Sequence, residues 1–267
     1  MLKTTLMACA ALAFGLAAGA SSALADTLAD IKARGSVIVA VDVSHPPYGM
    51  LNDQAVETGS DIETAKLLAE GLGVTLQVVP VSGANRVPFL LSNRVDLVIA
   101  SFSITEERKK VIDYSRPYGV IPVVISGPKD KAIKTAADLN GLDVAVARGT
   151  TADIELSKVI KASAGDANVV RYEDESTTNT AVATGQQQVF AAALSTAQAV
   201  AEQSPALDLE VKMELAAYPM AIGLRKNDEA LKTWVDQWVG ENLKNGKLNT
   251  IYQKYFNQPL PAEMMQN

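Results

Sequence analysis

Cysteine and histidine are almost missing from this chain. Its 267 residues include one Cys, Cys9, and one His, His45. Zinc clusters, disulfide frameworks and paired thiol–imidazole sites each need several such residues, so the composition excludes them within one chain. Walker loops, G-x-G-x-x-G, G-x-S-x-G and H-E-x-x-H motifs do not occur either. We therefore expect no metal and no cofactor.

A surplus of positive charge is also missing. Lys and Arg total 24 against 30 Asp and Glu, and the net charge is −6. Basic residues form no run, whereas a nucleic-acid-binding protein normally presents a basic face. We expect no nucleic-acid partner.

Long apolar runs are confined to the start of the chain. Residues 1–25 have the form of a secretory signal peptide, with Lys3 before an apolar stretch over 6–20 and a small-x-small site at Ala23-Leu24-Ala25. The alternative is a transmembrane anchor, for which the stretch is short. Cys9 has too few residues before it for a lipoprotein site. The sequence predicts a soluble, exported protein that starts at Asp26.

The rest of the chain alternates between strand and helix patterns, which predicts an α/β fold with parallel strands. A first series has strands at 37–41, 74–79 and 95–100 with helices at 62–72 and 87–91. A proline-bracketed segment, 120–125, follows. A second series has strands at 144–147, 169–172, 189–193, 209–213 and 221–224 with helices at 151–161, 177–184, 195–203 and, interrupted at Gly246, 228–255. Segments 93–101 and 185–193 occupy matching places, so we expect two similar lobes with a ligand cleft between them.

Polar residues that suit an anion follow the apolar strand at 95–100. Ser103 and Glu106 have capping-box spacing, which predicts that a helix begins there with Arg108 in its first turn. A cation in that turn interacts unfavourably with the helix dipole. The arrangement makes sense if an anion lies in front of the turn, held by N–H groups, hydroxyls and the guanidinium. The alternative is an exposed Arg108 paired with a nearby acid.

Three further segments place candidate residues at strand ends. Arg148-Gly149-Thr150-Thr151 precedes a helix and suits either an anion or a plain helix cap. Arg86 follows another strand, where surface solvation is the alternative. His45 lies beside two prolines in the loop after the first strand, and the lack of a partner His or Cys favours a packing role over catalysis.

Together these segments resemble the periplasmic solute-binding proteins for polar amino acids, which are receptors of ABC importers (bacterial extracellular solute-binding protein family 3). The resemblance covers the whole mature chain. It is carried by the following segments: Arg34-Gly35, Pro47-Tyr48, 59–65, 85–88, 95–98, 103–108, 113–118, 138–141, 149–151 and 246–256.

The resemblance implies a periplasmic two-lobed type II binding fold with two crossover hinge strands, lobe 1 being residues 26–118 with 219–267 and lobe 2 being residues 119–218. It further implies a monomer that works with a membrane permease. In this family the arginine matching Arg108 grips the ligand's carboxylate, assisted by the residues matching Ser101, Ser103 and Thr151. His45 matches a position at which relatives often place an aromatic side chain against the ligand.

One position departs from the family pattern. Relatives have an Asp for the ligand's α-ammonium where this chain has Ala193. Either another acid, such as Asp61, Glu63 or Glu173, takes over, or the ligand lacks an ammonium. With Arg86, Arg108 and Arg148 expected to converge, the sequence favours an anionic ligand, an amino acid or an organic acid.

Two other functions share this fold. An enzyme, similar to periplasmic dehydratases, needs a general acid or base, for which the cleft offers few candidates. A sensor that feeds a chemoreceptor differs from a transport receptor only in its partner. We expect a receptor and not an enzyme.

Overall fold

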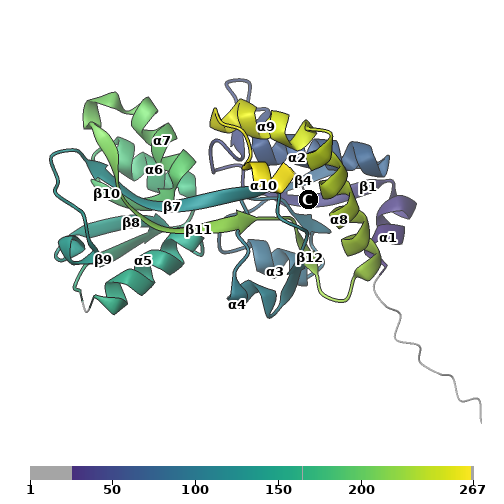
Figure 1. Ribbon diagram of the computed structural model, residues 1–267, viewed down its shortest axis with the longest axis horizontal. Coiled ribbons are helices and arrows are strands. Elements are labelled where there is room, and N and C mark those ends of the chain that lie inside the picture. The colour runs from purple at the N-terminus through teal and green to yellow at the C-terminus, as the bar shows by residue number, and fades with distance from the viewer. Residues whose placement is uncertain (1–25, 164, 266–267) are drawn as a thin grey trace, which may run out of the picture.

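The computed structural model describes residues 26–163 and 165–265. The predicted signal peptide, residues 1–25 with Cys9, lies outside the described residues. The chain forms two lobes, each built on a five-stranded mixed sheet with helices on both faces (Figure 1). The α/β, two-lobed fold class expected from the sequence is confirmed.

The first sheet has the strand order β4-β1-β5-β12-β6. β1 pairs in parallel with β4 and β5, and β12 runs antiparallel to β5 and β6. The strands of this lobe are β1 Ser36–Val41, β4 Thr75–Pro80, β5 Leu97–Val98, β6 Ile112–Tyr114 and β12 Gly223–Arg225, with a small hairpin of β2 Met50–Leu51 and β3 Glu57–Thr58. Its helices are α1 Thr27–Arg34, α2 Ser60–Leu72, α3 Arg86–Leu91, α4 Glu106–Lys109, α8 Glu229–Lys244, α9 Lys247–Phe256 and α10 Ala262–Met265.

The second sheet has the order β11-β7-β10-β8-β9. β8 is parallel to β9 and β10, whereas β7 is antiparallel to β10 and β11. The strands are β7 Gly119–Pro128, β8 Asp143–Ala147, β9 Asn168–Tyr172, β10 Val189–Ala193 and β11 Leu209–Met220; the helices are α5 Thr151–Ala162, α6 Glu175–Ala183 and α7 Leu194–Gln203, with 3-10 turns η1 Ala136–Leu139 and η2 Pro205–Leu207.

The two sheets share one strand arrangement. The order β4-β1-β5-β12 of the first sheet corresponds to β9-β8-β10-β7 of the second, so β5 and β10 take equivalent places. These are the strands of the similar segments 93–101 and 185–193. The weak internal similarity in the sequence thus reflects a repeated architecture.

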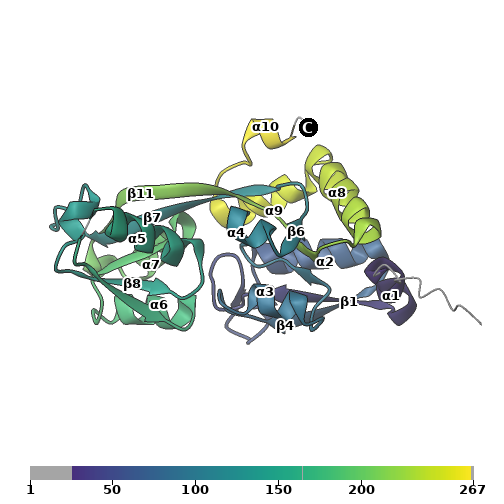
Figure 2. The ribbon, with the colours of Figure 1, turned by 90° about the horizontal axis from the view of Figure 1, so that it is seen from below.

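Two long strands join the lobes. β7 and β11 pair along their whole length, from Gly119 opposite Met220 to Pro128 opposite Leu209. Figures 1 and 2 both show this pair running from one lobe into the other. The lobe limits at 118 and 219, which we propose from the sequence, fall at the lobe 1 end of this pair.

Apolar residues explain both cores. In lobe 1, α2 buries Ile62, Ala65 and Leu68 against β1 and the last helices. Trp234 and Trp238 of α8 pack there too, and Gly246, at φ +81°, separates α8 from α9 as expected. In lobe 2, α5 buries Ala152 and Leu156 against Val144 and Val146 of β8. Burial of these faces drives each lobe to form.

Some predicted elements differ in extent. The apolar run 95–100 contributes only the two strand residues of β5, although Ile99 and Ala100 are fully buried in the core of the same lobe. The predicted strand 209–213 continues to Met220, and 221–224 becomes the shorter β12. α1 and β6 are not predicted from the sequence patterns.

Candidate functional site

Polar residues from both lobes meet where the sheets face each other. Ser103 Oγ lies 3.1 Å from Thr151 Oγ1, and Arg108 Nη2 donates to the carbonyl of Gly149 at 3.1 Å. His45 Nε2 lies 2.8 Å from Thr196 Oγ1. The lobes are therefore in direct contact along the predicted cleft.

Arg108 lies on α4, a helix of only four residues. The predicted cap is wrong: Thr105, and not Ser103, accepts from the Arg108 N–H at 3.2 Å. Ser103 is thereby free to face Thr151. Besides its bond to Gly149, Arg108 donates to the Ser103 carbonyl at 2.9 Å. Burial and nearby Arg86 lower the pKa of Arg108 to about 10, which leaves it charged at neutral pH.

Ser101 is held in a strained conformation at the end of the first sheet. Its φ is +43°, in the left-handed region that a side chain disfavours by about 1–3 kcal/mol. Its N–H donates to Asp61 Oδ2 at 2.6 Å, and its carbonyl accepts from Arg86 at 3.3 Å. Strain maintained by two buried charged residues is typical of a positioned binding residue.

Arg86 is buried inside lobe 1, with 3% of its surface exposed. The solvated alternative is therefore wrong. Its guanidinium donates to the carbonyls of Gly83 and Ala100 as well as Ser101. Arg86 and Arg108 lie 5.3 and 4.8 Å from the ring centre of Phe102. The two arginines form a positive centre at this end of the cleft.

His45 bridges the lobes as a neutral imidazole. Its Nδ1 lies 2.9 Å from Ser101 Oγ, and its Nε2 contacts Thr196 of α7. Burial, with the charge of Arg86 adding to it, lowers the pKa of His45 to about 3. The contact of 3.8 Å between His45 and Glu175 is consequently not an ion pair at neutral pH, although the distance alone would allow one.

Three buried carboxyl groups surround this histidine and Arg86. Asp42 and Asp61 belong to lobe 1, whereas Glu175 begins α6 of lobe 2; each is at most 2% exposed. Burial raises the pKa of Asp61 to about 7 and that of Glu175 to about 8. Sequence reasoning missed Asp42 and Glu175. The signal available for Glu175 was the helix start at Asp174-x-x-Thr177, which places the next side chain at the lobe face.

Of the remaining predicted site residues, Ala193 and Thr150 are buried, whereas Arg148 is exposed. Ala193 is buried at the end of β10 and belongs to the apolar cluster that also contains Tyr48, Tyr118 and Met220. Thr150 caps α5: its hydroxyl accepts from the Asp153 N–H at 3.2 Å. Arg148 is exposed, so the predicted convergence of three arginines reduces to Arg86 and Arg108.

Two glycines allow the lobes to approach. A methyl group on Gly83 would lie 2.7 Å from the Arg148 carbonyl oxygen, and one on Gly149 would lie 2.8 Å from Ala84 Cα. Both distances are shorter than a carbon side chain tolerates. The observed approach thus depends on glycine at both positions.

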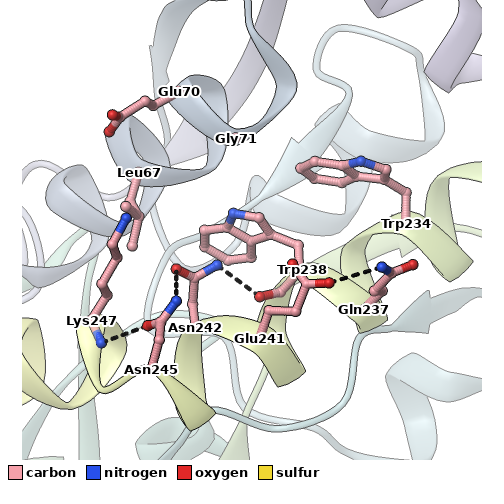
Figure 3. A pocket seen from close by; sticks show the side chains of 10 residues that line it. All are labelled: Leu67, Glu70, Gly71, Trp234, Gln237, Trp238, Glu241, Asn242, Asn245 and Lys247. Carbon is pink, nitrogen blue, oxygen red and sulfur yellow. Dashed lines mark hydrogen bonds between the residues drawn. The ribbon is translucent and has the colours of Figure 1, made fainter.

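A hollow of about 420 Å³ lies elsewhere in the molecule. It lies between α2 and α8, where the rings of Trp234 and Trp238 stack at 6.4 Å (Figure 3). Its amides are occupied by neighbours, as in the bond from Gln237 to Glu241 at 2.8 Å. Charged groups do not converge there as they do between the lobes, so the interlobe residues are the better candidate site.

Within residues 26–163 and 165–265, no three His, Cys, Asp or Glu side chains are grouped as a metal ion would need. No helix of that part of the chain has the length and apolar character to span a membrane.

Known proteins resemble this chain along most of its length. The L-cystine-binding protein TcyJ of Escherichia coli (strain K12) is 29% identical over 237 residues, which cover 85% of this chain and 84% of the relative. A glutamine-binding protein of Geobacillus stearothermophilus is 33% identical over 171 residues, or 62% of this chain and 64% of the relative.

Solved structures agree in fold. The P235GK mutant of the T. maritima protein ArgBP has a TM-score of 0.79 at 32% identity, covering 86% of this chain and 99% of that one. The ancestral amino acid-binding protein AncCDT-1, a precursor of cyclohexadienyl dehydratase, also scores 0.79, at 29% identity over 86% of this chain and 99% of its own. Residues 37–258 match the family described as bacterial extracellular solute-binding proteins, family 3, and the chain belongs to that family.

Proposed function

We propose that the protein is a periplasmic receptor of an ABC importer that captures a small carboxylate-bearing ligand between its lobes. Family membership supports a solute-binding role, and named relatives bind cystine, glutamine, glutamate or aspartate. The observation that carries the proposal is Arg108, a charged side chain that reaches from lobe 1 to the Gly149 carbonyl of lobe 2.

A ligand carboxylate would replace that carbonyl as the partner of Arg108. A guanidinium has five N–H donors and binds a carboxylate through two parallel hydrogen bonds. Ser103 and Thr151 supply hydroxyls from the two lobes at the same place. Because the groups come from both lobes, binding favours closure about the β7–β11 pair.

The net charge of the ligand depends on the balance of basic and acidic groups in the cleft. The sequence argument for an anion depended on three arginines and on Ala193. Arg148 is exposed, and the buried carboxyl groups of Asp42 and Glu175 lie beside the cleft. The proposal therefore covers the carboxylate and not a net negative charge.

Matched ligand pairs test the proposal. L-glutamine, L-glutamate, L-arginine and L-cystine are each titrated calorimetrically beside a deaminated analogue: glutaramate, glutarate, guanidinovalerate and dithiodipropionate. At least one ligand should bind, and its carboxylate ester should not. If none of the eight raises the melting temperature or binds, a carboxylate receptor of this kind is the wrong assignment.

Receptor and enzyme are told apart in the same samples. AncCDT-1 is described as the precursor of a dehydratase, and Glu175 is a buried carboxyl with a raised pKa, as general acids often are. A receptor returns its ligand unchanged after prolonged incubation, which mass spectrometry measures. We expect unchanged ligand, and a monomer with a membrane permease as its partner.

A further inference from the structure

We propose that Glu175 accepts the α-ammonium group of the ligand, in place of the carboxylate that position 193 lacks. The inference rests on the proposed function, since it needs a ligand whose carboxylate lies at Arg108. It makes the ligand a zwitterionic or cationic α-amino acid.

Glu175 is buried with one oxygen unused. It is 2% exposed, and in the part of the chain that the structure describes its Oε2 has no hydrogen-bond partner. Its Oε1 lies 3.8 Å from His45 Nε2, across the lobe boundary. Leaving a buried carboxylate oxygen unpaired is unfavourable, so a donor that arrives with the ligand would be stabilised there.

Arg86 does not donate to the unpaired oxygen of Glu175. Its guanidinium is directed to three carbonyls of its own lobe, and no ion pair within 4 Å joins it to an acid among the described residues. Among the acids, Asp42 has the largest electrostatic effect on Arg86, and it also raises the pKa of Glu175. Two acids, Asp42 and Asp174, and one guanidinium, that of Arg86, act on Glu175, and this balance favours an incoming cation there.

The other candidate acids are less suited to this role. Tyr255 donates to Glu63 at 2.7 Å, and Lys254 pairs with the same carboxylate. Glu173 is exposed on the loop before α6. Asp61 also has a buried oxygen without a partner among the described residues, Oδ1, but its Oδ2 accepts from the N–H of Ser101, so Asp61 already positions a residue of its own lobe.

The starts of two neighbouring helices explain the substitution. Ala193 directly precedes α7, and Glu175 is the first residue of α6, which packs against α7. Asp174 fixes the start of α6 through a capping box with Thr177. A carboxyl group at the start of α6 therefore lies at the same lobe face as one at position 193 would.

The cleft then has two ends of opposite sign. Arg108, with Ser103 and Thr151, forms the carboxylate end. From Ser101 the hydrogen-bond chain passes through His45 toward Thr196, beside Glu175. An α-amino acid carries both matching charges.

The test is Glu175→Gln, which keeps the shape and removes the carboxyl group that can ionise against an ammonium, with the exposed Glu173→Gln as matched control. Calorimetry uses the four amino acids and the four deaminated analogues. Wild type should bind an amino acid more tightly than its analogue. Glu175→Gln should weaken the amino acid about 10-fold to 100-fold and leave the analogue unchanged. Glu173→Gln should bind as wild type does.

A rescue variant guards against a merely structural effect. Ala193→Asp added to Glu175→Gln restores an acid at the lobe face, and we expect it to regain most of the lost amino-acid affinity. Wild-type amino-acid affinity in a folded Glu175→Gln protein would overturn the inference. Equal binding of an amino acid and its analogue by wild type would overturn it too, while leaving the proposed receptor intact. Binding of none of the eight compounds would instead defeat the receptor proposal itself.

Discussion

In the proposed receptor we expect ligand capture to depend most on Arg108, because this residue reaches a lobe 2 carbonyl from a lobe 1 helix. Truncation in Arg108→Ala removes charged hydrogen bonds worth about 1.5–3 kcal/mol each, so affinity for the carboxylate ligand should fall about 10-fold to 100-fold or more. Calorimetry on the purified variant measures the loss.

The matched control is Lys110→Ala, which removes an exposed cation from the end of the same short helix. It should bind ligand as wild type does. If Arg108→Ala folds and retains wild-type affinity, Arg108 is not the carboxylate partner.

Glu175 should also control how stability depends on pH. Its pKa is raised in the folded protein, from 4.5 to about 8, so the folded state holds a proton that the unfolded state releases. Stability of the ligand-free protein is then lost as pH rises between those values. Asp42 and Asp174 strengthen the shift, Arg86 opposes it, and His45 is the neutral group in contact.

Melting temperatures of wild type and Glu175→Gln across pH 4 to 9 test this. Asp61 contributes a loss of the same sign, so the prediction concerns the difference between the two proteins. Relative to wild type, the variant should gain stability as pH rises toward 8. A constant difference across the range would show that Glu175 does not titrate there.

The sequence predicts the role of a residue where the pattern of its neighbours along the chain determines that role. The Ser101–Arg108 segment shows its polar character in the sequence, and the structure brings Ser103 to Thr151. The helix start at Asp174-x-x-Thr177 was the one local signal for Glu175, and it does not show what the side chain meets. The burial of Glu175 and the approach of His45 from a distant loop are tertiary features that the sequence does not display.

At the scale of elements, the approach of two loops limits closure. Gly83→Ala places a methyl group 2.7 Å from the Arg148 carbonyl oxygen. Overpacking of this kind is unfavourable by about 1–3 kcal/mol, which is roughly 5-fold to 150-fold in the closing equilibrium. Ligand affinity should fall accordingly, whereas the lobes should keep their melting temperature.

Small-angle scattering gives an independent measurement. The ligand-saturated Gly83→Ala protein should keep a larger radius of gyration than ligand-saturated wild type. A variant as compact and as tight-binding as wild type would mean that this loop contact does not limit closure.

The helices and strands were largely predictable because their periodicity reflects burial. Val144 and Val146 of β8 and Ile62 and Leu68 of α2 are buried as the patterns require. The errors occur where tertiary contacts override local preference. Thr105 replaces Ser103 as a cap because Ser103 faces the other lobe, and β11 extends to Met220 because it pairs with all of β7.

At the scale of the molecule, export should produce a chain that begins at Asp26. Asp26 is the N-cap of α1, and its side chain accepts from the Ala29 N–H at 3.0 Å. Cleavage after Ala25 keeps this cap. N-terminal sequencing of periplasmic protein should read Asp-Thr-Leu; a retained leader or a lipidated Cys9 would refute the prediction.

The placement of β12 determines when each lobe can finish folding. β12, from residues 223–225, lies between β5 and β6, so the first sheet stays split until nearly the whole chain is available. The second sheet draws all its strands from residues 119–220 and closes without help from either end. Contacts that span more chain form later, because loop closure must precede them. Lobe 2 should therefore form first, and hydrogen-exchange labelling during refolding should find β8 and β10 protected before β1 and β5.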